Sequence, residues 1–433
     1  MSTSQPPNIV MILSDDHGYG DASCYGGPHV QTPNIDRLAA SGVRFTQFYA
    51  NSPVCSPSRA ALLTGRYPDT VGVPGVIRTD PGHSWGYFDP AAVTLPTMLR
   101  RAGYHTTIVG KWHLGLEEEN HPLRRGFDEF RGFLGDMMDD YFTHMRDGHN
   151  FMREGYETVD PEGHATDIFT RWAVETIRTQ AAAETPFFLY LAYNAPHTPI
   201  QPKPEWVEKV RAREPEASDQ RVRYLALTEH MDEGIGQVLD ALEAAGVAGN
   251  TLVVYASDNG GEERAGACND PWRGQKGDVY EGGIRVPCAA TWPGHIAPGR
   301  VDATPGLLMD FFPTFCAAAG VAVDHAIEGQ SMLPLLEGEP MDMSERTLYW
   351  VRREGGGAFG RFMTGQDYHA VRQGDLKLLH NSPYSELEMF NLAEDALETT
   401  NLVREDDPDF DRLRSAMQAR IQAGGGVPWQ KRE

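Results

Sequence analysis

The chain has 433 residues, 40% of them hydrophobic and 23% charged, which is the composition of a globular protein large enough for more than one structural unit. Its 38 basic and 61 acidic residues leave a net charge of −23 at pH 7, and this balance argues against nucleic acid and anionic membranes as partners because both require a basic face. No apolar run approaches the length of a membrane span.

The N-terminal segment and the cysteines bear on the cellular compartment. Residues 1–7 contain no apolar run of the kind found in a signal peptide, and a strand pattern begins at Asn8. We therefore expect a cytoplasmic protein, or a periplasmic one if the sequence is that of a mature form. The cysteines are widely spaced and odd in number, which predicts neither a disulfide framework nor a cysteine metal site. They are Cys24, Cys55, Cys268, Cys288 and Cys316.

Strand and helix patterns alternate over the first 340 residues. Short apolar runs predict buried strands at residues 8–13, 106–109, 186–193 and 251–256. Helical spacing and first-turn prolines predict helices that begin near Pro33 and Pro57, and helices at residues 95–101, 165–178 and 224–242. This alternation predicts an α/β fold in which a large, mostly parallel sheet lies between helix layers.

The pattern changes after residue 340. Short strands are predicted at residues 347–350, 370–372 and 376–379, a flexible loop at 355–357 and a final helix at 409–423. We therefore expect a main α/β domain over residues 1–340 and a smaller α+β subdomain, with an antiparallel sheet, over residues 341–433.

Chemically active side chains follow four of the predicted strands. In chain order they are Asp15 and Asp16, then Lys111 and His113, then His197, and finally Asp258 and Asn259. Because parallel strands present their carboxyl ends at one edge of a sheet, and open α/β sheets bind ligands just outside that edge, these side chains are expected to converge.

The oxygen donors among these residues favour a hard metal ion. The carboxylates of Asp15, Asp16 and Asp258 and the side-chain carbonyl of Asn259 suit Ca²⁺ or Mg²⁺. Carboxylates held together repel one another unless a cation neutralises them. The alternative for Asp15 and Asp16 is a turn or helix cap, and the second pair on another strand end favours the metal site.

Basic side chains could surround an anion at the same edge, on an otherwise acidic protein. They are Arg59, Lys111, His113, His197 and Lys276. Taken singly, each histidine could be a structural residue and Lys276 a solvated surface lysine. If the second strand continued through this segment, Lys111 and His113 would lie on one face and Trp112 on the other.

The most specific pattern is the run Cys55-Ser56-Pro57-Ser58-Arg59, followed by Leu63-Thr64-Gly65-Arg66. By itself, Cys55 could be a small buried hydrophobic residue. The complete run resembles the signature of the type I formylglycine-dependent sulfatases, arylsulfatase-like members of the alkaline phosphatase superfamily. Further matching segments are 14–16, 110–115, 126–128, 257–260, 281–287, 328–331 and 390–392.

The resemblance implies two cofactors. In this family the cysteine is oxidised to Cα-formylglycine after translation, so a formylglycine-generating enzyme is an expected partner of Cys55 during maturation. One Ca²⁺ per chain is expected, with Mg²⁺ or Mn²⁺ as alternatives. Its implied ligands are Asp15, Asp16, Asp258, Asn259 and the modified Cys55.

The resemblance also implies a role for each residue in hydrolysing an aryl or carbohydrate sulfate ester to an alcohol or phenol and inorganic sulfate. A hydroxyl of the hydrated aldehyde at Cys55 attacks sulfur, with Asp258 helping to deprotonate it. Arg59 and Lys111 hold the diol, and Lys111 and Lys276 stabilise charge on the sulfuryl oxygens. His197 protonates the leaving group. His113 then takes the proton whose loss lets the covalent sulfate ester release sulfate.

Two other functions remain open at this point. A phosphonate monoester or phosphodiester hydrolase shares the cysteine signature, but such relatives tend to have a histidine after the metal-binding aspartate, where this chain has Asn259, and lack the Lys111/His113 pair. A non-catalytic protein that binds sulfated saccharides is expected if Cys55 stays unmodified. Loops at residues 72–89, 135–164 and 355–369 are expected to line the pocket mouth and to select the substrate.

Overall fold

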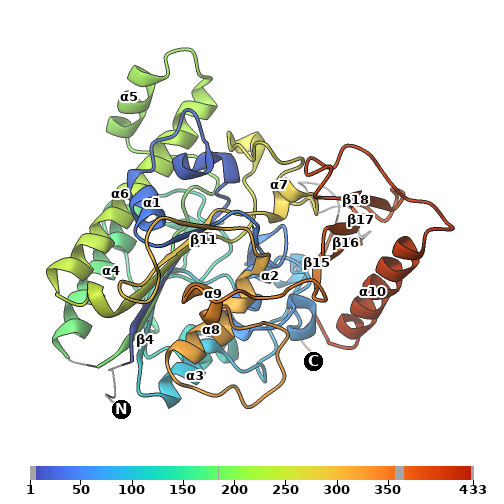
Figure 1. Cartoon of the computed structure of the whole chain (residues 1–433). Coiled ribbons are helices and arrows are strands. Elements are labelled where there is room, and N and C mark those ends of the chain that lie inside the picture. Colours follow the sequence, from blue (N-terminus) through green and yellow to red (C-terminus); the bar gives the residue numbers. More distant parts are fainter. Residues whose placement is uncertain (1–5, 184, 356–364, 431–433) are drawn as a thin grey trace.

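A ten-stranded sheet forms the centre of the protein in this computed structural model, which describes residues 6–183, 185–355 and 365–430 (Figure 1). The strand order is β13-β2-β12-β11-β1-β10-β4-β5-β8-β9. The central strands run parallel and are β11 (Thr251–Ser257), β1 (Asn8–Ser14), β10 (Phe187–Ala192), β4 (His105–Lys111) and β5 (Glu129–Phe133). The outer strands are β12 (Cys288–Thr291), β2 (Val43–Phe45), β13 (Arg300–Asp302), β8 (Met152–Glu154) and β9 (Glu157–Thr158). The predicted α/β architecture is confirmed.

Helices cover both faces of this sheet, as Figure 1 shows. Alternate side chains of β1 enter two different cores: Ile9 and Met11 pack in one, and Val10 and Ile12 in the other. The first core receives α2 (Cys55–Thr64), α3 (Leu95–Arg101), α8 (Phe311–Ala318) and α9 (Leu333–Leu336). The second receives α1 (Pro33–Ala40), α4 (Ala165–Ala182) and α6 (Asp219–Ala244). Burial on both faces explains why these strands are continuous apolar runs in the sequence.

Shorter elements complete the main part of the molecule. Helix α5 (Pro204–Arg213) projects beyond the sheet in Figure 1, and its Trp206 and Val210 pack against residues of α6. The remaining short elements are α7 (Glu281–Ile284), the strand pair β3 (Phe48–Tyr49) and β14 (Gly306–Leu307), and the strand pair β6 (Met145–Arg146) and β7 (His149–Asn150).

The C-terminal part contains the expected antiparallel sheet and final helix. Its strands are β15 (Thr347–Gly355), β16 (Gly365–Gln373), β17 (Leu376–His380) and β18 (Glu388–Asn391), and α10 (Pro408–Gly425) packs on them. Strand β18 is an addition to the sequence prediction. Residues 356–364, which include most of the expected loop at 355–357, lie outside the described residues. The domain boundary at residue 340 stays a prediction.

Two local predictions need correction. Helix α2 begins at Cys55, so Pro57 is its third residue; the first turn tolerates proline because its N–H groups have no partner within the helix. Strand β4 continues to Lys111, and His113 then adopts a left-handed conformation with φ of 60°. The expected strand alternation between Lys111 and His113 is therefore absent.

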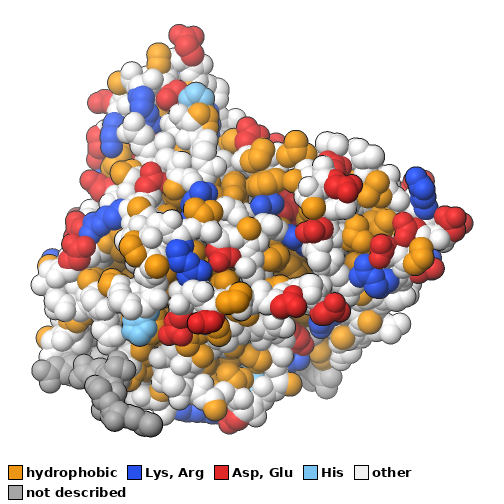
Figure 2. Space-filling model, viewed as in Figure 1, with side chains coloured by type: hydrophobic (Ala, Val, Ile, Leu, Met, Phe, Trp, Pro, Cys, Tyr) orange, Lys and Arg blue, Asp and Glu red, His pale blue; other side chains and the backbone are white. Residues whose placement is uncertain are grey.

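The surface agrees with the acidic composition. Figure 2 shows Asp and Glu side chains spread over the visible face with Lys and Arg among them. In the part of the chain that the structure describes, no helix has both the length and the apolar character needed to cross a bilayer.

Candidate functional site

Four adjacent parallel strands bring the site together, because β11, β1, β10 and β4 are neighbours in the sheet. The loops after them are joined by backbone hydrogen bonds: Asp15 N–H donates to the Ala195 carbonyl at 3.1 Å, and Asp258 N–H donates to the Ser14 carbonyl at 3.1 Å. Strand ends that are far apart in the sequence thus meet at one edge, as expected from the sequence.

Gly110 allows β4 to deliver Lys111 to this edge. Its φ is 107°, and a Cβ atom there would lie 2.0 Å from the carbonyl oxygen of Ala192 on β10. A side chain would therefore force the two strands apart.

Cys55 is the first residue of α2 and is buried at the centre of the site. Its Sγ lies 3.4 Å from Asp15 Oδ1, and ligand atoms of Asp15, Asp16, Cys55 and His197 all lie within 4.8 Å of one another. Burial and the neighbouring Asp15 carboxylate raise the pKa of the Cys55 thiol well above its usual value. The unmodified thiol therefore stays protonated, which is unsuited to a cysteine nucleophile.

Arg59 lies one turn along α2 from Cys55 and organises the acidic groups. Its Nε and Nη2 donate to Asp258 Oδ2 at 3.0 and 2.8 Å, and its Nη1 donates to the Lys111 carbonyl at 3.1 Å. Lys111 Nζ in turn lies 2.5 Å from Asp15 Oδ2. All four side chains are buried.

The pKa values of the Asp15 and Asp258 carboxylates are shifted in opposite directions. Burial favours the neutral form of Asp15, but the positive charges of Lys111 and Arg59 outweigh it and hold the pKa of Asp15 well below its usual value. Burial and the Asp15 charge raise the pKa of Asp258 to about 7. Such a separation between neighbouring carboxylates is typical of sites that perform acid–base chemistry.

Lys276 joins the site through its loop. Its backbone N–H donates to the Gly261 carbonyl at 3.0 Å, next to the end of β11, and the N–H of Gly277 donates to the Pro53 carbonyl at 2.9 Å, next to Cys55. Lys276 Nζ lies 2.6 Å from Asp16 Oδ2 and 3.1 Å from His197 Nε2. The structure therefore places Lys276 among the predicted site residues, with its ammonium paired to Asp16 and His197 and its side chain 18% exposed.

The hydrogen bonds of the two histidines identify their tautomers. His197 Nδ1 lies 2.6 Å from the Thr198 carbonyl, which can only accept, so Nδ1 donates and Nε2 faces Lys276. Burial and the Lys276 charge lower the pKa of His197 to about 4. His113 Nε2 likewise donates to the Ile77 carbonyl at 2.9 Å. Its Nδ1 is buried without a hydrogen-bond partner among the described residues, which leaves a free proton acceptor.

The oxygen donors fit a hard divalent cation. Asn259 Nδ2 donates to Asp16 Oδ1 at 2.8 Å, whereas Asn259 Oδ1 is buried and has no hydrogen-bond partner among the described residues. An unpaired buried acceptor beside three carboxylates is what a bound cation would satisfy. These donors are therefore suited to hold Ca²⁺, and less well Mg²⁺, which requires a stricter octahedral arrangement of its ligands. The residues that provide them are Asp15, Asp16, Asp258 and Asn259.

A cavity of about 660 Å³, here called the catalytic cavity, opens over Cys55, His113, His197 and Lys276. Its other walls are mostly charged. They include Arg78 from the first predicted loop, Asp136 from the second, Glu262 and Arg264 after β11, and Arg352 and Glu354 on β15. Residues 356–364 of the third predicted loop lie outside the described residues. Arg78 and Asp136 thus come from loops predicted to line the pocket mouth, whereas Glu262, Arg264, Arg352 and Glu354 lie outside those loops and only the packing of distant segments identifies them.

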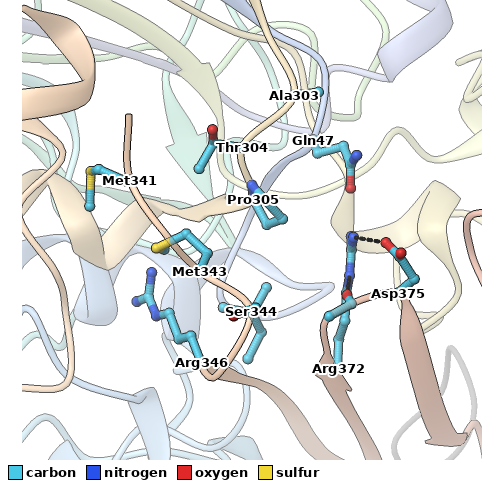
Figure 3. A pocket seen from close by; sticks show the side chains of 12 residues that line it. Gln47, Ala303, Thr304, Pro305, Met341, Met343, Ser344, Arg346, Arg372 and Asp375 are labelled. Carbon is cyan, nitrogen blue, oxygen red and sulfur yellow. Dashed lines mark hydrogen bonds and ion pairs between the residues drawn. The ribbon is translucent and has the colours of Figure 1, made fainter. Parts of the chain in front are cut away.

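A separate cavity of about 460 Å³ lies between Gln47, Pro305, Met341 and Arg372 (Figure 3). Its basic groups are already paired: Arg346 donates to both carboxylate oxygens of Asp310, at 2.6 and 2.8 Å, and Arg372 donates to the Tyr49 hydroxyl at 2.6 Å and to the Gly374 carbonyl at 2.8 Å. None of the predicted site residues lines it. We therefore place the functional site in the catalytic cavity.

Comparisons with known proteins agree with this geometry. The family model described as Sulfatase matches residues 7–321, and the model described as N-sulphoglucosamine sulphohydrolase, C-terminal, matches residues 274–424. N-acetylgalactosamine-6-sulfatase of Sus scrofa is 37% identical, over 80% of this chain and 69% of that protein. Steryl-sulfatase of Mus musculus is 32% identical, over 80% of this chain and 67% of that protein. The crystal structure of Ps i-CgsB in complex with k-i-k-neocarrahexaose superposes with a TM-score of 0.88 at 31% identity, and covers 99% of this chain and 95% of that chain.

Proposed function

The chain belongs to the sulfatase family of the alkaline phosphatase superfamily and is a sulfuric ester hydrolase. From this premise we propose that its substrates are sulfate monoesters of carbohydrates. We propose further that they are hydrolysed at residue 55 after Cys55 has been converted to formylglycine. The observation that carries the proposal is the cluster of Cys55, Asp15, Asp16 and His197, whose ligand atoms lie within 4.8 Å of one another at the base of the catalytic cavity.

The walls of the catalytic cavity support a carbohydrate substrate over an apolar aryl or steroid sulfate. Arginines and carboxylates dominate its lining, and its apolar side chains are those of Val54, Val76 and Met137. A hydroxylated ring can replace the water bound to such groups by hydrogen bonds, whereas an apolar ring would leave them unpaired. The carbohydrate named in the complex of the Ps i-CgsB structure is consistent with this choice.

Formylglycine at position 55 would supply a hydrated aldehyde whose hydroxyl attacks the ester sulfur. The amino end of α2, where Cys55 is the first residue, favours negative charge at this point. Both hydrogen bonds from Arg59 to Asp258 go to Oδ2, and we assign the Asp258 carboxylate as the acceptor of the nucleophile's proton. Arg59 and Lys111 hold the nucleophile in place.

The remaining residues handle charge and protons. Lys111 and Lys276 stabilise the charge that grows on the sulfuryl oxygens, as pre-positioned cations in a site shielded from water. His197 presents Nε2 to the cavity and donates a proton there to the departing sugar oxygen; the arriving sulfate anion favours its protonated form. His113 accepts a proton at Nδ1 when inorganic sulfate leaves.

Ca²⁺ held by Asp15, Asp16, Asp258 and Asn259 would add a fixed positive charge that favours binding of the sulfate group. Its coordination by these residues is supported by the unpaired Asn259 oxygen and by the hard-oxygen character of the set.

The test is sulfate release from 4-nitrophenyl sulfate and from sulfated monosaccharides by protein produced with and without a formylglycine-generating enzyme. Mass spectrometry of the Cys55 peptide gives the fraction converted. We expect turnover to rise in proportion to conversion and Cys55→Ala to fold and release no sulfate. Cys268→Ser, which changes a half-buried cysteine outside the cluster, is the matched control and is expected to keep its activity. Faster hydrolysis of a phenylphosphonate ester than of the sulfate would contradict the proposal.

A further inference from the structure

A second cavity, of about 380 Å³, lies beside the catalytic cavity and shares Arg78 with it. A small hollow of about 10 Å³, room for about one water molecule, lies between the two. It is lined by Ile77, Arg78 and Leu116, which also line the second cavity, and by His113 and Asp136, which also line the catalytic cavity. Because both cavities are lined by Arg78, they are adjacent, and a molecule larger than one sugar ring could contact both across this exposed side chain.

The second cavity combines aromatic and polar groups. Tyr87 and Trp429 contribute rings, and Trp429 is held by a parallel stack on Trp85 with ring centroids 5.3 Å apart. Thr79 and Ser84 contribute hydroxyl groups to its wall. Flat rings beside hydrogen-bonding groups match a sugar ring, which has apolar C–H faces and polar edges.

Arg78 is charged and loosely paired. Its guanidinium lies 3.9 Å from Asp136 and 3.8 Å from Glu354, distances too long for hydrogen bonds. Each of these carboxylates has a closer partner: Arg146 lies 2.9 Å from Asp136, and Arg352 lies 2.7 Å from Glu354. The side chain of Arg78 is 39% exposed, so an anion can reach it.

The backbone around Arg78 is nevertheless held in place. Its N–H donates to the Ser84 hydroxyl at 2.8 Å, and this hydroxyl donates back to the Arg78 carbonyl at 3.2 Å. The guanidinium of Arg78 donates no hydrogen bond to any of the described residues, and on this well-held loop it is suited to bind a carboxylate or sulfate through two N–H groups.

We propose that the second cavity is a subsite for the sugar unit next to the one that loses its sulfate, and that Arg78 is a specificity-determining residue that binds an anionic group of this neighbouring unit. This inference rests on the proposed function. It identifies the substrate as an oligosaccharide with anionic groups on adjacent units, bound with the reacting sulfate over Cys55 and the neighbouring ring against Tyr87 and Trp429.

The test compares KM and kcat for a sulfated monosaccharide and two tetrasaccharides. An iota-carrageenan tetrasaccharide, which is sulfated on both sugars of its repeat, carries sulfate on the neighbouring unit, and a chondroitin 6-sulfate tetrasaccharide carries a carboxylate there; the better of the two identifies the anion. For the fully converted wild-type enzyme we expect a KM at least about tenfold lower for one tetrasaccharide than for the monosaccharide. Arg78→Gln is expected to raise that KM about tenfold, with a smaller change in kcat, because it removes binding that is equal in the ground state and the transition state.

Three variants separate this role from a structural one. Arg78→Lys keeps the charge and should recover part of the lost affinity. Trp429→Ala should raise the tetrasaccharide KM independently of salt, whereas the effect of Arg78→Gln should shrink at high salt. Arg171→Gln is the matched control, since Arg171 is 53% exposed, lies 4.0 Å from Glu175 and lines neither cavity.

Equal KM values for mono- and tetrasaccharides in the wild-type enzyme would overturn the subsite, and an equal loss for both substrates in Arg78→Gln would overturn its assigned role. Turnover of 4-nitrophenyl sulfate reports on the proposed function separately, because this substrate has no neighbouring sugar unit.

Discussion

Arg59 donates two hydrogen bonds to the same carboxylate oxygen of Asp258, at 3.0 and 2.8 Å, although 199 positions separate the two residues in the chain. The pair connects α2, which begins with Cys55, to the end of β11, which carries two of the proposed metal ligands. Both side chains are fully buried, so water cannot solvate the charge that remains if either partner is removed. The nucleophile and the proposed metal site are thereby held in one unit.

Arg59→Lys should weaken this unit while keeping the charge. A lysine donates from one nitrogen and cannot reach both Asp258 and the Lys111 carbonyl, so we expect about 1–3 kcal/mol less stability and at least a tenfold lower kcat. Thermal unfolding and turnover of 4-nitrophenyl sulfate measure the two effects, with kcat divided by the formylglycine content because Arg59 belongs to the modification signature.

Arg37→Lys on α1 is the control for this substitution. Arg37 also bonds two carboxylates, Asp240 at 2.7 Å and Glu243 at 2.6 Å, but its side chain is 37% exposed and lies outside the site. Surface pairs of this kind contribute about 0–1 kcal/mol. A wild-type kcat and melting temperature in Arg59→Lys would show that the two-bond geometry is dispensable.

Calcium should stabilise the folded protein through Asn259. At a concentration 100 times its dissociation constant, a ligand that binds the folded state alone adds about 2.7 kcal/mol. We expect EGTA to lower the melting temperature and the activity, added Ca²⁺ to restore both, and Asn259→Ala to show a smaller calcium-dependent shift. Asn401→Ala removes an exposed amide that accepts from the Met389 N–H, and should leave the calcium-dependent shift intact. A full shift in Asn259→Ala would contradict its place among the ligands.

His197→Asn should affect sugar sulfates more than 4-nitrophenyl sulfate. Nitrophenolate leaves without protonation, whereas a sugar alkoxide needs the proton that we assign to His197 Nε2; loss of a general acid costs about 10²–10⁴-fold. His113→Asn should reduce both reactions alike, because His113 is assigned to sulfate release, a step common to all substrates. Equal losses for both substrates in His197→Asn would remove it from the role of general acid.

Asp69 should make stability depend on pH. Burial raises its pKa from 3.8 to about 6, despite a hydrogen bond from the Tyr349 hydroxyl at 3.2 Å. Between these pH values the folded protein keeps a proton that the unfolded chain releases, so stability falls as pH rises through this window. The new side chain in Asp69→Asn cannot ionise. The free energy of unfolding of this variant relative to wild type should therefore be higher at pH 8 than at pH 4, by up to about 3 kcal/mol, and thermal unfolding at the two pH values measures this difference.

The matched control for this prediction is Asp406→Asn, which changes an exposed carboxylate. Its stability difference from wild type is expected to stay the same at both pH values. If Asp69→Asn behaves in the same way, the Asp69 carboxyl titrates normally in the folded protein.

Much of the fold and the core of the site could be predicted from local patterns. Apolar runs predicted both ends of β1, β10 and β11 with an error of one residue or none, because strands buried on both faces must be apolar throughout. The polar residues that follow them could then be assigned to one sheet edge, since parallel strands end together. Strand β18 escaped prediction because it has four residues, and helix α5 because Trp206 and Val210 are its buried residues, so the apolar pattern of each is weak.

The sequence by itself determined which residues are candidates for the chemistry: the Cys55 run and the polar residues after four strands. Tertiary structure alone decided their pairing, the start of α2 at Cys55, the left-handed His113 and the walls of the two cavities. The physical reason is the range of the forces involved. Strand and helix periodicity is encoded over a few neighbouring residues, whereas the position of Arg78 beside Glu354 depends on how a loop near the N-terminus packs against β15, and no local pattern records that contact.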